Sequence, residues 1–219
     1  MKQFSADKYN VAWYKLAEFV ARGEKERALG MYRLLMHSFE NEALASQLAG
    51  DIFLSFNDIA DAVKKYEQAA YLYKKNNQCI EAAAVYEHII SLYPDSEIFL
   101  KALFELYMRI DHEKRGFEVL EQLVVIYINK NQLDALASYM QEVEQTIPQY
   151  KLFDIYEKII ITSAHTDMIL TPFLSEYMQI VMMAFMKKNG DALQLFLEKL
   201  KAANKRYYEY SCQLIENDI

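Results

Sequence analysis

The chain has 219 residues, of which 53% are hydrophobic, so it is long enough to bury a substantial core. Its 5 Gly and 3 Pro argue against disordered linkers and turn-rich β architectures. Because 31 acidic residues outnumber 24 basic ones, the formal net charge of −7 disfavours nucleic acid or an anionic membrane surface as a partner.

Turn-forming residues recur along the whole chain and divide it into segments that read as helices of about four turns. The breaks lie at Arg22-Gly23, Asn41, Asn57-Asp58, Asn76-Asn77, Pro94-Asp95, Asp111, 129–131, 146–148, Asp167 and Asn189-Gly190. Most are roughly 16–19 residues apart, and no segment shows the alternation of period two that is typical of a strand. We therefore expect an all-α fold of about eleven helices.

Local chemistry supports several helix ends. Asp58 and Asp95 are suited to cap the N–H groups at the start of the helices that follow them. Thr171-Pro172 predicts a cap followed by proline at the first helical position, and Pro148 predicts the same arrangement for an earlier helix. Asn189-Gly190 is expected to end the helix before it, since Asn and Gly tolerate the left-handed conformation.

One apolar pattern occurs twice, at positions twenty residues apart. The first copy consists of Ile59, Ala62, Val63, Tyr66, Ala69, Ala70 and Tyr73. The second copy consists of Cys79, Ala82, Ala83, Tyr86, Ile89, Ile90 and Tyr93. Steps of three and four place each set on one face of an α-helix. Two such faces, joined by the short polar segment 76–78, predict an antiparallel helical hairpin built as a repeat.

The tyrosines divide into two groups by their position on these faces. Those on the apolar faces are expected to pack in the core: Tyr66, Tyr73, Tyr86 and Tyr93. Others lie off a single face and are open to either packing or contact with a partner: Tyr71, Tyr207, Tyr208 and Tyr210.

Part of the chain resembles a tetratricopeptide repeat. The first match has a small residue and then an aromatic on one helix, followed by Ala, aromatic and Ala on the next: Gly50, Phe53, Ala62, Tyr66 and Ala69. A second set fits the same template, including its terminal proline: Ala70, Tyr73, Ala82, Tyr86, Ile89 and Pro94. The good matches cover residues 43–94. The helical pair here spans about 36–38 residues instead of about 34, and residues 66–74 are similar to SNAP-type solenoids that engage coiled-coil bundles.

This resemblance implies a right-handed α-α superhelix of stacked antiparallel hairpins. We expect residues 1–163 to form the repeat body. Residues 164–219 are expected to form a C-terminal helical pair, about 172–188 and 191–216, that caps the array.

The sequence contains no recognisable catalytic or metal-binding motif. His37, His88, His112 and His165 stand singly, without a His-Glu-x-x-His or paired-Cys pattern. Neither a glycine-rich phosphate loop nor a Gly-x-Ser-x-Gly elbow is present. We therefore expect no enzyme activity, no metal and no cofactor.

The resemblance also implies a wall of first helices that binds an extended or helical peptide. Gln47, Asp51 and Leu54 are expected to face that wall, and the exposed aromatic Tyr71 is a further candidate contact. The expected function is a non-catalytic adaptor or chaperone-like module that binds a protein or peptide partner. The alternative is a structural component that self-associates through the Met- and aromatic-rich segment 168–186 in its C-terminal helices. A helical lipid or isoprenoid enzyme is disfavoured, because no Asp-Asp-x-x-Asp motif is present.

Cysteine use and hydropathy bear on location. Cys79 and Cys212 form no framework of paired cysteines, and residues 1–5 lack the apolar stretch of a secretory signal. We therefore expect a cytoplasmic protein. The segment 168–186 includes Pro172, Ser175, Glu176 and Gln179, so we expect a buried or partner-covered helix there and no membrane insertion.

Overall fold

The computed structural model describes residues 3–37, 41–187 and 190–217. Within these ranges the chain forms twelve α-helices and one short 3-10 helix, with no β-strand, which confirms the all-α prediction. Contacts between residues group the chain into two compact units, Met1–Gly116 and Phe117–Ile219, and the division falls within α7 (Glu113–Asn129). The predicted division into residues 1–163 and 164–219 stays a prediction.

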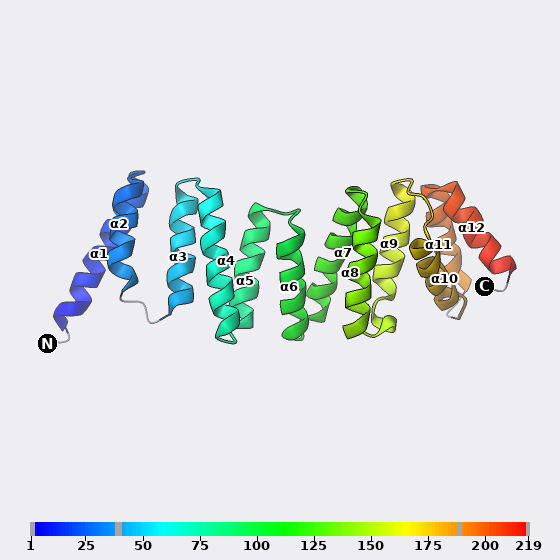
Figure 1. Ribbon diagram of the computed structural model, residues 1–219, viewed down its shortest axis with the longest axis horizontal. Coiled ribbons are helices and arrows are strands. Elements are labelled where there is room, and N and C mark those ends of the chain that lie inside the picture. The colour runs from blue at the N-terminus through cyan, green and yellow to red at the C-terminus, as the bar shows by residue number, and fades with distance from the viewer. Residues whose placement is uncertain (1–2, 38–40, 188–189, 218–219) are drawn as a thin grey trace. The chain divides into compact units, whose positions relative to one another are not determined.

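Unit 1 is a succession of helices that pack mainly on their neighbours in the chain. It contains α1 (Gln3–Ala21), α2 (Lys25–Met36), α3 (Glu42–Ser55), α4 (Ile59–Lys75), α5 (Cys79–Leu92) and α6 (Glu97–Arg109). The main contacts join α1 to α2, α2 to α3, α3 to α4, α4 to α5 and α5 to α6 (Figure 1). Its helices therefore form a helical-repeat arrangement, and α4 with α5 is the hairpin predicted from the duplicated apolar face.

Most residues of the two predicted apolar faces of this hairpin are buried, while Ile59 and Ile90 are half-buried. On α4 the buried residues are Ala62, Val63, Tyr66, Ala69, Ala70 and Tyr73. On α5 they are Cys79, Ala82, Ala83, Val85 and Ile89. Tyr86 is half-buried, but the prediction that Tyr93 packs in the core is wrong, because it is 42% exposed. Tyr93 follows the last residue of α5 with a non-helical backbone of φ −132° and ψ 75°, so the helical spacing no longer applies to it.

Gly50 allows α3 and α4 to approach closely. A Cβ atom at this position would lie 2.5 Å from Cε1 of Tyr66, well inside van der Waals contact. The Tyr66 ring is 1% exposed and fills the space that the missing side chain leaves. This is the pairing of a slender and a bulky residue on which the repeat-like packing depends.

Six helices among the described residues end in the same hydrogen-bonded stop. A residue with positive φ follows each helix: Gly23, Asn57, Asn77, Asp111, Asn131 and Asp167. Its N–H donates to the carbonyl three residues back, and the next N–H donates to the carbonyl five residues back. In five of these stops the second carbonyl belongs to an aromatic residue: Phe19, Phe53, Tyr73, Tyr107 and Tyr127. Helices α5 and α8 (Leu133–Thr146) instead end just before Pro94 and Pro148.

Two predicted helix starts are confirmed. Asp58 precedes α4, and its carboxylate accepts a hydrogen bond from the backbone N–H of Asp61 at 3.4 Å. Helix α10 begins at Pro172, and the Thr171 hydroxyl accepts from the backbone N–H of Leu174 at 3.3 Å.

Two others are corrected. The residue that precedes α6 is Ser96 and not Asp95, because the helix begins one residue later than the turn signal indicated. Pro148 precedes the 3-10 helix η1 (Gln149–Lys151) and not α9, which begins at Phe153. Of the predicted helix end at Asn189-Gly190, Asn189 lies outside the described residues, and Gly190 is the first residue of α11.

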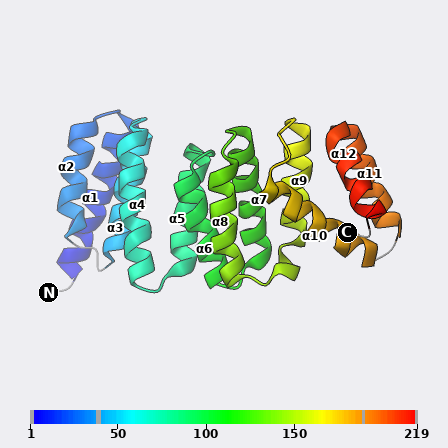
Figure 2. The ribbon, with the colours of Figure 1, turned by 45° about the vertical axis from the view of Figure 1, so that its right-hand side comes forward.

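Unit 2 packs differently, because its last helices contact more than their chain neighbours. Beside α8 it contains α9 (Phe153–His165), α10 (Pro172–Lys187), α11 (Gly190–Ala203) and α12 (Lys205–Glu216). Helix α11 contacts α9 as well as α10, and α12 contacts α10 as well as α11. Figure 2 shows α10 running obliquely beside α9.

The prediction of one helix over 191–216 is wrong. Asn204 separates α11 from α12 with an extended backbone of φ −158° and ψ 122°. Its side chain accepts from the N–H of Arg206 at 2.9 Å and donates to the Asp167 carboxylate at 2.7 Å. Because these hydrogen bonds satisfy groups that a continuous helix would bond differently, Asn204 starts a new helix, and the described chain has twelve helices.

The folding of α12 also settles the position of Tyr207. Its side chain is 1% exposed, so it packs in the core, whereas Tyr208 and Tyr210 are half-buried. No helix in the described part of the chain combines the length and the apolar character needed to cross a bilayer.

Candidate protein-binding site

Two of the four predicted contact residues lie together at the boundary between α3 and α4. Gln47 and Asp51 are one turn apart on α3, and each accepts a hydrogen bond from a buried tyrosine of α4. The Tyr73 hydroxyl donates to Gln47 Oε1 at 3.1 Å. The Tyr66 hydroxyl donates to Asp51 Oδ1 at 2.7 Å. The tyrosines therefore fix the orientation of two polar groups at the surface of α3.

His88 of α5 extends this hydrogen-bonded chain. Its Nε2 lies 3.2 Å from the Tyr66 hydroxyl oxygen, and its ring meets the Tyr66 ring edge-on at 4.8 Å between centroids. Because the Tyr66 proton points to Asp51, we assign Nε2–H of His88 as the donor to the Tyr66 oxygen. The chain runs from His88 through Tyr66 to Asp51 and joins three helices.

Tyr66 is suited to a fixed hydrogen bond and not to acid–base chemistry. Burial raises its pKa well above the ordinary value, and the hydrogen bond to the Asp51 carboxylate raises it further. The phenol therefore keeps its proton at neutral pH and acts as a permanent donor to Asp51.

Leu54 and Tyr71 stand in different relations to this pair. Leu54 lies three residues after Asp51, on the same side of α3, and is half-buried. Tyr71 is 65% exposed and lies about 140° around α4 from Tyr66, since each residue turns a helix by about 100°. The structure thus gathers Gln47, Asp51 and Leu54 on one face and leaves Tyr71 on another. That these four residues bind a partner stays a prediction.

An apolar hollow opens beside Asp51, between α1 and α3. Its volume is about 260 Å³, and it is lined by Trp13, Leu16, Ala17, Val20, Leu48, Asp51, Ile52 and Ser55. Among these described lining residues Asp51 alone is charged. Asp51 therefore stands at the border of an apolar surface, and its carboxylate is directed to α4, where Tyr66 holds it.

The α1 wall of this hollow was missed by the sequence reasoning. Trp13, Ala17 and Val20 follow one another at helical spacing, and Trp13 remains 39% exposed. One signal in the sequence could have indicated this wall. The single Trp of the chain lies in a helix that has more apolar residues than one buried face needs.

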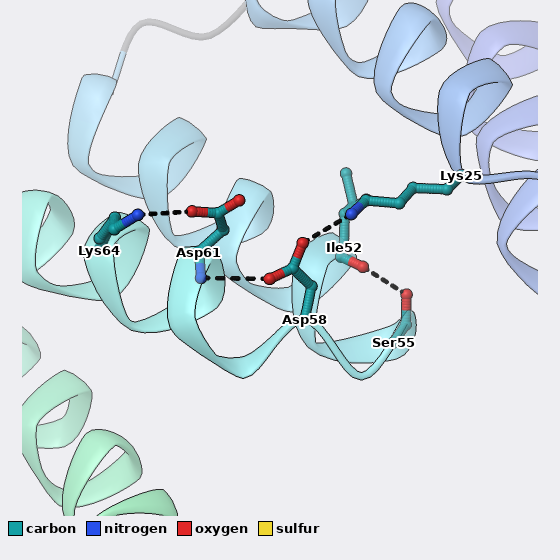
Figure 3. A network of polar contacts seen from close by, with 6 residues as sticks. All are labelled: Lys25, Ile52, Ser55, Asp58, Asp61 and Lys64. Atoms are coloured by element: carbon teal, nitrogen blue, oxygen red, sulfur yellow. Dashed lines mark hydrogen bonds and ion pairs between the residues drawn. The ribbon is translucent and has the colours of Figure 1, made fainter.

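A polar network joins the start of α2 to the turn between α3 and α4 (Figure 3). Lys25, the first residue of α2, places Nζ 2.6 Å from Asp58 Oδ2 and 5.4 Å from the centre of the Phe53 ring. Asp61 in turn pairs with Lys64 at 2.8 Å. The hydrogen bond between Lys25 and Asp58 raises the pKa of Lys25 and lowers that of Asp58, so both side chains are charged at neutral pH. The pair ties the start of α2 to the turn between α3 and α4.

Two further carboxylates accept hydrogen bonds from tyrosines. In unit 1, Glu87 accepts from the Tyr107 hydroxyl and from Arg115, and burial together with Glu87 raises the pKa of Tyr107 to about 12. In unit 2, Glu144 Oε1 accepts from Tyr156 at 2.9 Å and from Tyr177 at 2.6 Å. Neither carboxylate lines an apolar hollow described here, so neither offers the combination found at Asp51.

No group of three or more potential metal ligands gathers anywhere in the described ranges. In comparisons with known proteins, no family model and no curated protein matches the chain. The candidate site therefore rests on the geometry around Asp51.

Proposed function

We propose that this protein is a non-catalytic helical-repeat module that binds another protein through the α1–α3 surface of unit 1, in the manner of an adaptor or chaperone-like protein of the cytoplasm. The observation that carries the proposal is the open apolar hollow beside the fixed carboxylate of Asp51. Apolar surface bordered by a few oriented polar groups is typical of recognition sites.

We further propose that the repeats are of the tetratricopeptide type. Gly50 and Tyr66 meet as that packing requires. The left-handed stops at Gly23 and Asn57 are 34 residues apart, as are those at Asn77 and Asp111, which is the length of a tetratricopeptide repeat. In such repeats the first helix of each pair lines a binding groove, and α3 would supply Gln47, Asp51 and Leu54 to it.

Affinity capture with mass spectrometry tests the proposed function. The first bait is the folded wild-type chain. The second is the α3 variant, which carries Gln47→Arg and Asp51→Arg. The third is the control, which carries Asp134→Arg and Gln141→Arg at exposed positions of α8. We expect one or more proteins to be captured by the wild type and the control but lost from the α3 variant. Recovery of no specific protein, or equal recovery by all three baits, would contradict the proposal.

A second candidate function, self-assembly, is favoured by one observation in unit 2. A hollow of about 430 Å³ between η1, α9 and α10 is lined by Tyr150, Phe153, Ile180 and Met183 among others. Tyr150 is 78% exposed, and Met183 and Met186 are more than 40% exposed. Light scattering over a dilution series separates the two functions, because a strict monomer at micromolar concentration excludes self-assembly while leaving partner binding intact.

A further inference from the structure

We propose that the α1–α3 hollow receives one amphipathic helix of a partner protein, which buries an aromatic or branched aliphatic side chain in the hollow and places a Lys or Arg against Asp51. This inference rests on the proposed function and specifies the chemistry of the partner.

The volume of the hollow matches a side chain better than a small-molecule ligand. Cavities of about 150 Å³ hold a benzene ring, whereas pockets for small molecules usually begin at about 300 Å³. At about 260 Å³, the hollow fits one large apolar side chain, or two smaller ones.

The length of the hollow matches a helix. Its α1 wall runs from Trp13 to Val20 and its α3 wall from Leu48 to Ser55. Each wall is about 10 Å long at 1.5 Å per residue, which is two helical turns. A third helix can lie between two such walls and present residues at i and i+4 to them.

The charge beside the hollow selects a cation. Asp51 Oδ1 accepts a hydrogen bond from the Tyr66 hydroxyl at 2.7 Å. An ionised carboxylate has further lone pairs, so the exposed Asp51 can also accept hydrogen bonds from a cation that approaches from the solvent. Because Tyr66, which is itself bonded to His88, already holds the carboxylate, a partner cation gains the contact without ordering the acceptor. The net charge of −7 also favours approach of a basic partner.

The single Trp of the chain makes the hollow directly observable. Trp13 lines it, so fluorescence of the full chain reports occupancy when the probe contains no Trp. The probe is a synthetic helical peptide of about 18 residues on an Ala/Gln background, long enough to be helical, with two Leu four residues apart and a Lys one turn beyond. Three matched peptides replace the Lys by Glu, the two Leu by Ala, or a central Ala by Pro.

We expect the Lys peptide to shift Trp13 emission to the blue and to bind at least about tenfold more tightly than each matched peptide. Asp51→Asn keeps an acceptor for Tyr66 and should remove the preference for Lys over Glu, whereas Asp134→Asn, the charge-matched control on α8, should keep it.

Different results overturn the inference without deciding the proposed function. If affinity capture finds a partner through Gln47 and Asp51 while no peptide changes Trp13 emission, the hollow is not the recognition point. Equal binding of the Lys and Glu peptides would refute the cation, and equal binding of the Pro peptide would refute the helix. If the wild-type chain captures no partner and binds no peptide, both the proposed function and this inference are refuted.

Discussion

The two units use tyrosine hydroxyls in different ways. In unit 1, Tyr66 and Tyr73 each donate to a separate acceptor at the surface of α3. In unit 2, Tyr156 and Tyr177 donate to the same oxygen of Glu144, and their rings pack at 4.4 Å between centroids. Their helices differ accordingly, since α11 and α12 contact several helices while α1 to α6 contact mainly their chain neighbours.

This difference separates a group that can meet a partner from one that is committed to the fold. Asp51 is exposed and has one tyrosine donor, whereas Glu144 is half-buried between two tyrosines that are at most 4% exposed. The same chemistry therefore orients a surface carboxylate in unit 1 and joins helices in unit 2. The following predictions test that division, from the largest expected effect to the smallest.

Glu144→Ala should have the largest effect, because it leaves two buried hydroxyls without their acceptor. Each buried group that loses its partner costs about 1–3 kcal/mol, so we expect a loss of about 3 kcal/mol in the free energy of unfolding. Urea unfolding measures it. Glu144→Gln keeps an acceptor oxygen and should restore most of the loss; equal losses in both variants would show that the hydrogen bonds are not responsible.

Gly50→Ala should destabilise the α3–α4 contact by about 1–3 kcal/mol, since the new Cβ overlaps the buried Tyr66 ring. Gly30→Ala in α2 is the matched control, because nothing lies within 4 Å of its Cβ position. There, Ala should stabilise the helix by about 0.5–1 kcal/mol. Thermal unfolding of the two variants should therefore shift in opposite directions, and a shift in the same direction would contradict the close contact.

Alkaline pH should weaken unit 2 through its buried tyrosines. Burial and then Glu144 raise the pKa of Tyr177 and Tyr156 above the ordinary value of 10.0. The folded state thus holds these protons more tightly, so the stabilisation is complete below about pH 10 and is lost as the pH rises above it. Each tyrosine contributes about 1.4 kcal/mol per pH unit in that range.

The measurement is urea unfolding at several pH values between about 9 and about 11. Tyr177→Phe should give a shallower decline than the wild type, and Tyr71→Phe, whose ring is 65% exposed, controls for removal of a hydroxyl. An unchanged slope in Tyr177→Phe would contradict the proposed role of its proton.

The ion pairs between helices should matter least. Lys25→Gln removes the pair with Asp58 in unit 1, and Lys199→Gln removes the pair with Glu157, at 2.9 Å, in unit 2. Both pairs are solvent-exposed in part, so we expect small and similar decreases in the unfolding midpoint that shrink as salt is added. Lys64→Gln, within one helix, is the local control. A large loss for Lys25→Gln alone would show that unit 1 depends on this connection.

The sequence predicted best what local chemistry decides. Spacing placed the buried face of α4 correctly and that of α5 in part, and Thr171-Pro172 marked the start of α10. The break at Asn204 was missed because a single Asn stands there within an otherwise helical pattern, and its side chain bonds Asp167, which is far away in sequence. Tyr207 was left open for the same reason, since its burial depends on where α12 packs.

The candidate site was predictable only in part. Repeat spacing placed Gln47 and Asp51 on one face of α3, but nothing in a helical period indicates that Tyr73 and Tyr66 bond them. The contribution of Trp13 depends on α1 lying beside α3, a relation between segments that periodicity does not encode.

The recurring helix stops carry a consequence for how such a chain can grow. Each stop is closed by two hydrogen bonds that reach back no further than five residues, so the instruction to end a helix is contained in its own last turn. If a segment that runs from one helix stop to the next is duplicated in the gene, the copy carries the residues that form its own stop. In five of the six stops these residues include the aromatic side chain four residues before the positive-φ position. Adding or removing whole helical hairpins should therefore leave the stops of the other helices intact. Only the helix faces that become new neighbours would need different side chains.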